Sequence, residues 1–148
     1  MAVGYYRAAG PAMRFDIERL EERIGRGLPE DYKGFLMRQD GGRVEGNDQA
    51  VNEIFCLRDD APNWASIWWK LDVFSGRIPN WLLPVASDEY GNLFAISLRD
   101  SDFGSVWFWD HEEETDEDES AAEDNIECRS VSWSSFIDDL QPLNDSES

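Results

Sequence analysis

The feature that most limits the fold is a series of three apolar segments in the second half of the chain. These segments are rich in β-branched and aromatic residues: "WLLPVAS" (81–87), "LFAISL" (93–98) and "SVWFWDH" (105–111). The turns between them, "DEYGN" (88–92) and "RDSDFG" (99–104), are short. Two short connections in succession predict antiparallel neighbours, which is a β-meander.

The third of these segments has two distinct faces. Successive side chains of a strand point to opposite sides, so Val106 and Phe108 share one face while Trp107 and Trp109 share the other. The segment then runs directly into a block of negative charge, "DHEEETDEDES" (110–120). We interpret the apolar strand as part of the core sheet and the carboxylates as displayed where that sheet ends.

The first half of the chain has helical periodicity instead. Apolar residues recur at intervals of three and four in "FDIERLEERIGRG" (15–27), with Asp16 as the expected N-cap, and in "LPEDYKGFLMRQDGG" (28–42). A third helix is predicted over 62–74, with Trp64 on its inward stripe. In that helix the adjacent Trp68 and Trp69 fit either core filling or an aromatic contact surface.

Shorter signals complete the organisation. Two more strands are predicted over 53–57 and 126–131, and a closing helix with a Ser cap is predicted from residue 132. Helices first, then strands, then a helix indicate an α+β fold with a central antiparallel sheet. We expect a flexible N-terminal leader (1–14), a single domain (15–142) with an acidic loop (112–125), and a solvated tail (143–148).

The net charge of −19 is concentrated in the second half of the chain. Residues 1–74 carry 13 acidic and 10 basic side chains, whereas residues 75–148 carry 19 acidic and 3 basic ones. A field of this sign repels nucleic acid and anionic membranes and attracts basic partners. The sequence therefore argues against binding to nucleic acid or membranes and favours a basic protein partner.

Two further features indicate a cytoplasmic protein. The N-terminal stretch has no secretory signal pattern, and no apolar run approaches the length of a membrane helix. Cys56 and Cys128 have no neighbours at metal-ligand spacing, and we expect two reduced thiols rather than a disulfide.

The sequence holds little that suggests catalysis or a cofactor. Its one histidine, His111, lies between Asp110 and Glu112, but no nucleophile motif, phosphate loop or second histidine completes an active site. The acidic run lacks the turn glycine of a good Ca²⁺ site. We therefore expect no enzyme activity, no cofactor and no dedicated metal site.

The acidic run from Glu112 to Asn125 supports two interpretations. It is either a solvated insert that keeps the protein soluble or a binding element for a basic surface. Seven of the eight residues from Glu112 to Glu119 are acidic. An extended chain advances about 3.4 Å per residue, close to the charge spacing along one DNA strand, so the run approaches the charge density of a nucleic-acid strand.

The binding interpretation defines a set of partner-contacting residues. Charge alone accelerates association, whereas tight binding also needs rigid anchors, for which aromatic side chains near the strand end are candidates. Core burial is the alternative for at least one of the two tryptophans. The predicted contact residues are Asp110, Glu112, Glu113, Glu114, Asp116, Glu117, Asp118, Glu119, Trp107 and Trp109.

Four pieces of the chain together resemble the SUKH superfamily, which includes bacterial immunity proteins and domains like the yeast cell-wall assembly regulator. They are "LPEDYKGFLMRQDGG" (28–42), "LLPVASDEYGNLFAISLRD" (82–100), "GSVWFWDHE" (104–112) and "SWSSFIDDL" (132–140). Two departures stand out. Asp40 occupies a position that is usually Asn, and the acidic run is heavier than the family pattern.

The resemblance implies an α+β fold with a central antiparallel sheet and a function in protein binding. Many bacterial relatives neutralise toxins, often nucleases, while others act as regulators or adaptors. We therefore expect a non-catalytic immunity protein that neutralises a basic toxin domain, a nuclease of a polymorphic or contact-dependent toxin system. The alternative is a regulatory adaptor that holds a cellular partner through the same acidic surface.

Overall fold

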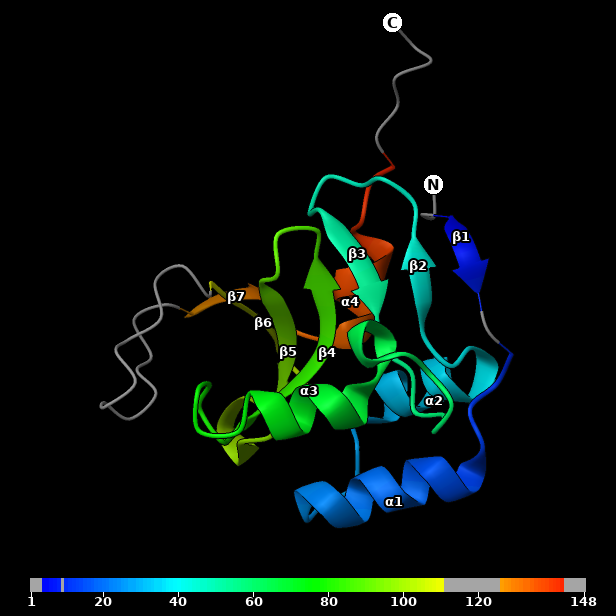
Figure 1. Ribbon diagram of the computed structural model, residues 1–148. Helices are drawn as coiled ribbons and strands as arrows, with labels where there is room; N and C mark the ends of the chain where they lie inside the picture. The colour runs from blue at the N-terminus through cyan, green and yellow to red at the C-terminus, as the bar shows by residue number, and fades with distance from the viewer. Residues whose placement is uncertain (1–3, 9, 111–125, 143–148) are drawn as a thin grey trace, which may run out of the picture.

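Seven strands form one antiparallel sheet in which each strand pairs with its neighbours in the sequence (Figure 1). The computed structural model describes residues 4–8, 10–110 and 126–142. The predicted meander and the α+β class are confirmed. The strands are β1 (Tyr5–Ala8), β2 (Gly42–Val44), β3 (Val51–Ile54), β4 (Leu82–Asp88), β5 (Leu93–Ser97), β6 (Val106–Trp109) and β7 (Ile126–Ser130).

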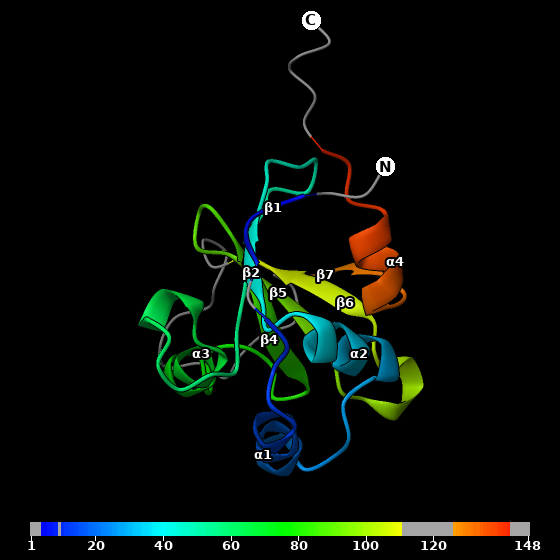
Figure 2. The ribbon, with the colours of Figure 1, turned by 90° about the vertical axis from the view of Figure 1, so that its right-hand side faces the viewer.

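The helices lie on both faces and at one end of this sheet. They are α1 (Arg14–Ile24), α2 (Glu30–Arg38), α3 (Ile67–Val73) and α4 (Trp133–Asp138), with 3₁₀ turns η1 (Asn63–Ala65) and η2 (Asp100–Asp102). Figure 2 shows α3 on one side of the sheet and α2 and α4 on the other. In Figure 1, α1 lies beyond the end of the sheet opposite to the β2–β3 and β4–β5 connections.

The alternating faces of the central strands explain this layering. Phe94 on β5 stands opposite Phe108 on β6, and its ring also packs on Phe136 of α4 with centroids 5.3 Å apart. The next residue along β6, Trp109, faces the other way and packs edge-on against Phe74 at the end of α3, at 5.5 Å. The period-two alternation predicted for this segment is confirmed, and it separates the two halves of the core.

The expected flexible leader is wrong for part of its length. Residues 5–8 form β1, which pairs with β2 through the partners Tyr5↔Val44 and Ala8↔Gly42. The sheet therefore begins before residue 15. Both strands are very short, at four and three residues, which leaves little sequence in which an alternating pattern can be recognised.

The predicted helix over 62–74 is interrupted at Ser66. The N–H of Cys56, just after β3, donates to the carbonyl of Ala65 at 2.8 Å, and the carbonyl of Cys56 accepts the N–H of Ile67 at 3.0 Å. This pairing holds Ser66 in an extended conformation with ψ of 124°. Its side chain accepts the N–H of Trp69 and caps α3. As a result Trp64 falls on η1 and is 50% exposed, so its predicted inward position is wrong.

Of two predicted N-caps, the structure confirms Ser132 and contradicts Asp16. Ser132 caps α4 by accepting the N–H of Ser135 at 3.1 Å, which confirms the Ser cap of the closing helix. In contrast α1 begins at Arg14 with Met13 as its N-cap, so Asp16 lies within the first turn and is buried. At this position its carboxylate still interacts favourably with the positive end of the helix dipole.

Candidate functional site

The order of the strands brings three connections to one end of the sheet. In an antiparallel meander alternate connections leave the sheet at the same end, so residues 45–50, residues 88–92 and the paired strand ends Trp109 and Ile126, which flank 110–125 in the sequence, lie at the end opposite α1. These ranges hold two, two and ten carboxylates, respectively, and no Lys or Arg. We call this end of the sheet the acidic end and define it by these three ranges.

The β4–β5 turn presents an exposed aromatic side chain at the acidic end. The Asp88 carboxylate accepts the N–H of Tyr90 at 2.8 Å and the N–H of Asn92 at 2.9 Å, and it also binds the Asn92 side chain. This carboxylate is therefore used to fix the turn. Tyr90 itself is 69% exposed, and the neighbouring Glu89 charge raises the pKa of its hydroxyl.

Tyr90 is a candidate site residue that the sequence analysis did not identify, because "DEYGN" was interpreted only as a turn. Tyrosine is enriched at binding hot spots, since its ring offers a large apolar area and its hydroxyl a hydrogen bond. The register relates it to the start of the third connection. Leu93 on β5 pairs with Trp109 on β6, so the turn before Leu93, which contains Tyr90, lies at the same end of the sheet as Asp110, which follows Trp109.

The β2–β3 connection is a rigid loop that also contacts the C-terminal part of the chain. The Asn47 side chain accepts the N–H of Val51 and donates to the carbonyls of Glu45 and Val51. Asp48 exchanges two hydrogen bonds with Gln141: the Asp48 N–H donates to the Gln141 carbonyl and the Gln141 N–H to the Asp48 carboxylate, at 3.0 and 2.9 Å. The loop therefore presents its charge in a fixed position.

The third connection leaves and re-enters the sheet at the same edge. Trp109 of β6 and Ile126 of β7 are paired residues, so the segment between them begins and ends at the acidic end. Of its predicted contact residues, Asp110 is described by the structure, at partial burial. His111 and the predicted carboxylates Glu112, Glu113, Glu114, Asp116, Glu117, Asp118 and Glu119 lie outside the described residues.

The two tryptophans predicted as anchors have different environments. Trp109 is 1% exposed and packs in the core, so it is not available to a partner, as the alternative interpretation expected for at least one of the pair. Trp107 is half-buried, stacks edge-on with Trp81 at 5.5 Å and donates its indole N–H to Ser105. It lines a groove between η2 and β7, together with residues that include Phe103 and Val131.

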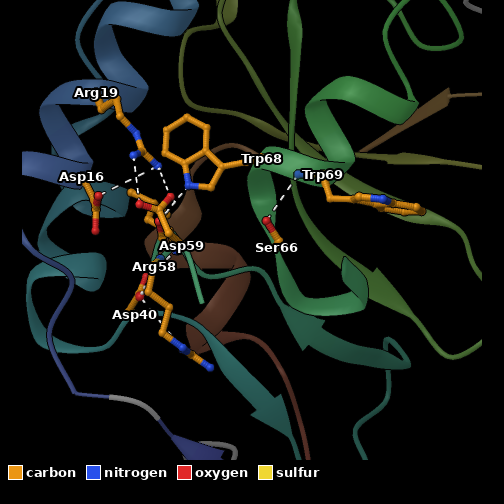
Figure 3. Close-up of polar contacts among 9 residues, drawn as sticks. Asp16, Arg19, Asp40, Arg58, Asp59, Ser66, Trp68 and Trp69 are labelled. Atoms are coloured by element: carbon orange, nitrogen blue, oxygen red, sulfur yellow. Dashed lines mark hydrogen bonds and ion pairs between the residues drawn. The ribbon is translucent and has the colours of Figure 1, made fainter. Parts of the chain in front are cut away.

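A second polar cluster lies near α1, and Figure 3 shows its geometry. The Arg19 guanidinium binds both carboxylate oxygens of Asp59, at 2.7 and 3.2 Å, and lies 4.1 Å above the Trp68 ring. The indole N–H of Trp68 donates to the carbonyl of Leu57 at 2.7 Å. These contacts tie the chain after β3 to α1 and α3, which indicates a structural role.

The Trp68–Trp69 pair does not form one aromatic surface. In Figure 3 the two side chains point in different directions: Trp68 lies under Arg19, whereas Trp69 points away from the cluster. Trp69 is 37% exposed. The alternatives left open by the sequence therefore divide between the two residues, with packing for Trp68 and partial exposure for Trp69.

The described residues supply neither a metal centre nor a membrane helix. Among residues 4–8, 10–110 and 126–142, no group of three or more His, Cys, Asp or Glu side chains is placed to hold a metal ion. Over the same residues, no helix combines the length and the apolarity needed to cross a membrane. Cys56 is buried, Cys128 is exposed, and both are free thiols.

Comparisons with known proteins identify the family. The profile of the SMI1 / KNR4 family (SUKH-1) matches residues 11–141. The SPbeta prophage-derived uncharacterized protein YokK of Bacillus subtilis (strain 168) is 31% identical over 120 aligned residues. That alignment covers 65% of this chain and 60% of the relative, so the chain spans less than two thirds of the relative's length. With a match over nearly its whole length and the α+β fold described above, this chain belongs to the SMI1 / KNR4 family (SUKH-1).

Proposed function

We propose that this chain is a non-catalytic, cytoplasmic immunity protein that binds and neutralises a basic toxin domain, a nuclease of a polymorphic or contact-dependent toxin system. The family includes immunity proteins, which supports protein binding as the general activity. The observation that supports the proposal is the acidic end: the three ranges of sequence that connect strands there hold fourteen carboxylates and no Lys or Arg.

The chemistry of a nuclease explains why such an edge inhibits it. A nuclease binds the phosphate backbone of its substrate with a groove of basic side chains. The carboxylates of the acidic run approach the spacing of phosphates on one strand, so the run competes for the same groove. Electrostatic attraction of this kind raises association rates by roughly 10 to 10³ and weakens as salt increases.

A tight complex also needs anchors that do not depend on charge. In the proposed complex the contact residues are Asp110, the seven carboxylates from Glu112 to Glu119, and the exposed ring of Tyr90, with half-buried Trp107 at the margin. Trp109 is excluded because it belongs to the core. The fixed β4–β5 turn holds Tyr90 in one position, which lowers the entropic cost of binding.

The test uses a charge-matched pair of variants as baits. The first replaces Glu113, Glu114 and Glu117 with Gln. The second replaces Glu18, Glu22 and Glu30, three exposed carboxylates of α1 and α2 for which the described residues show no ion pair, with Gln. Both variants lose three negative charges. Each bait, with the intact chain, is used to capture partners from a lysate of the source cells at low salt and is eluted with increasing salt.

The proposal predicts that the intact chain and the α1/α2 variant hold a basic toxin domain and that the acidic-run variant releases it at lower salt. Co-expression of the intact chain should then restore growth of cells that express the captured domain. Equal retention by all three baits would place the binding site elsewhere. Capture of a cellular protein that is not toxic would favour the regulatory adaptor instead.

A further inference from the structure

A cavity of about 250 Å³ lies away from the acidic end, between α1, α3 and the start of β4. Polar and apolar groups contribute almost equally to its walls, and the apolar part is formed by residues such as Leu71, Phe74, Ile78 and Leu83. The residues with polar side chains in its lining are Arg23, Lys70, Ser75 and Asn80. A cavity that combines apolar walls with convergent polar side chains can hold a small molecule that has both kinds of group.

Lys70 is the unusual member of this lining. Its ammonium lies 5.1 Å from the ring centres of Phe55 and Trp69 and 6.0 Å from that of Phe74. The side chain is about half-buried, and this burial lowers its pKa. Within the part of the chain that the structure describes, no carboxylate pairs with it.

Other partly buried cations of this protein are treated differently. Arg26 binds the Asp100 carboxylate and the carbonyl of Leu98, and Arg99 binds Asp102. Lys33, the other of the two lysines in the sequence, pairs with Glu21 at 3.3 Å. Carboxylates outnumber Lys and Arg by 32 to 13, so a shortage of acidic groups does not explain why Lys70 has none.

The surroundings of Lys70 leave its charge only partly compensated. Aromatic faces attract a cation, but they supply no acceptor for the three N–H donors of an ammonium group. A carboxylate supplies both the opposite charge and the acceptor oxygens. Arg23, which also lines the cavity, already donates to the Asp72 carboxylate at 2.8 Å. Lys70 is therefore the cation that can pair with a bound ligand.

We propose that this cavity binds a small organic carboxylate whose aliphatic chain occupies the apolar walls and whose carboxylate pairs with Lys70. The hydroxyl of Ser75 and the amide of Asn80 are the additional polar groups of the lining. A bare inorganic anion fits less well, because it leaves the walls formed by Leu71, Ile78 and Leu83 without a partner. This site is independent of the proposed immunity function.

Hexanoate is a suitable probe, and the two lysines of the chain provide the readout. Protein labelled with ¹³C at lysine gives separate NMR signals for Lys70 and Lys33. The Lys33 signal serves as an internal reference, because Lys33 is on α2, outside this cavity, and is paired with Glu21. Hexylamine has a matching chain with the opposite charge, and inorganic phosphate is an anion without a chain. For eight non-hydrogen atoms we expect a Kd in the roughly millimolar range.

The expected result is that hexanoate shifts the Lys70 signal saturably and raises the pKa of that lysine, while the Lys33 signal stays in place. Hexylamine and phosphate should leave the Lys70 signal unchanged. Lys70→Met should abolish the shifts that hexanoate causes in the backbone amides around the cavity, and Lys33→Met should retain them.

Three results would overturn the proposal. The first is the absence of any saturable shift of Lys70 with hexanoate. The second is binding of hexanoate to Lys70→Met with undiminished affinity, since the cation would then have no role. The third is an equally strong response to phosphate, which would indicate a general anion site in place of a carboxylate site with an apolar requirement.

Discussion

The backbone N–H of Leu57 donates a 2.7 Å hydrogen bond to the carboxylate of Asp40, a residue 17 positions earlier in the chain. The same carboxylate accepts the N–H of Arg58 at 3.2 Å. Asp40 is 5% exposed, and it follows α2, while Leu57 follows β3. One buried side chain therefore holds two segments together where the helical part of the chain meets the sheet.

Asp40→Ala should lower the free energy of unfolding by about 1–3 kcal/mol, because it leaves the buried N–H of Leu57 without an acceptor. Asp40→Asn should cost less, since the amide oxygen retains one of the two acceptor positions. Urea unfolding of both variants at pH 7 measures this difference. Equal losses in the two variants would show that the hydrogen bond to Leu57 is not the stabilising contact.

The pH dependence of stability should reveal opposite contributions from two carboxylates. Burial raises the pKa of Asp40 above its usual 3.8, so its contribution to stability is present at acid pH and is lost as the pH rises through its folded-state value. The hydrogen bond from Arg99 lowers the pKa of Asp102, so that carboxylate stabilises above pH 3.8 and loses its contribution as the pH falls.

These signs predict how the two Asn variants differ from the parent between pH 7 and pH 3. The stability of Asp40→Asn relative to the parent should decrease as the pH falls, whereas that of Asp102→Asn should increase. Chemical unfolding at several pH values gives both differences. Parallel curves for the two variants would contradict the assignment of a raised pKa to Asp40 and a lowered one to Asp102.

Gly41→Ala should destabilise the protein more than Gly76→Ala. Both glycines have positive φ, +76° and +83°, which costs roughly 1–2 kcal/mol for a residue with a side chain. A Cβ at Gly41 would also lie 2.4 Å from the carbonyl oxygen of Ile54, whereas a Cβ at Gly76 would meet nothing within 4 Å. Thermal unfolding of the pair isolates the steric contribution, and similar losses would show that β3 yields to accommodate the methyl group.

The two thiols should react at very different rates in the native protein. Cys128 is exposed on β7, whereas Cys56 is 2% exposed, donates to the carbonyl of Ala65 and has its pKa raised by burial to about 11. Since the thiolate is the reactive form, a disulfide reagent at pH 8 should modify Cys128 rapidly and Cys56 only on unfolding. Fast reaction of both thiols in the native state would contradict the buried position of Cys56.

Tyr90→Ala should weaken binding of the captured toxin domain by at least about tenfold, as expected for a truncated hot-spot residue. Its stability should change by less than about 0.5 kcal/mol, because the side chain is exposed and the turn is fixed by Asp88 instead. Phe15→Ala is the matched control, since Phe15 is an equally exposed aromatic on α1. An equal loss of affinity in both variants would remove Tyr90 from the site.

Local patterns in the sequence determined the central strands, the closing helix and the distribution of charge. The apolar run in 93–98 and the alternation in 105–111 are properties of each short segment, and the Ser132 cap depends on a residue three positions away. The acidic run is likewise visible without a structure. Each of these features results from interactions between residues that are close in sequence.

Tertiary structure alone decided the features that depend on distant backbone groups. The strands β1 and β2 exist because they pair with each other, and Ser66 leaves the predicted helix because Cys56 bonds to its neighbours. Nor does any short window of sequence show that Trp109 is buried while Tyr90 is exposed, or that Lys70 lines a cavity. These outcomes follow from which segments meet in space, because backbone pairing and burial are set by partners far away in the chain.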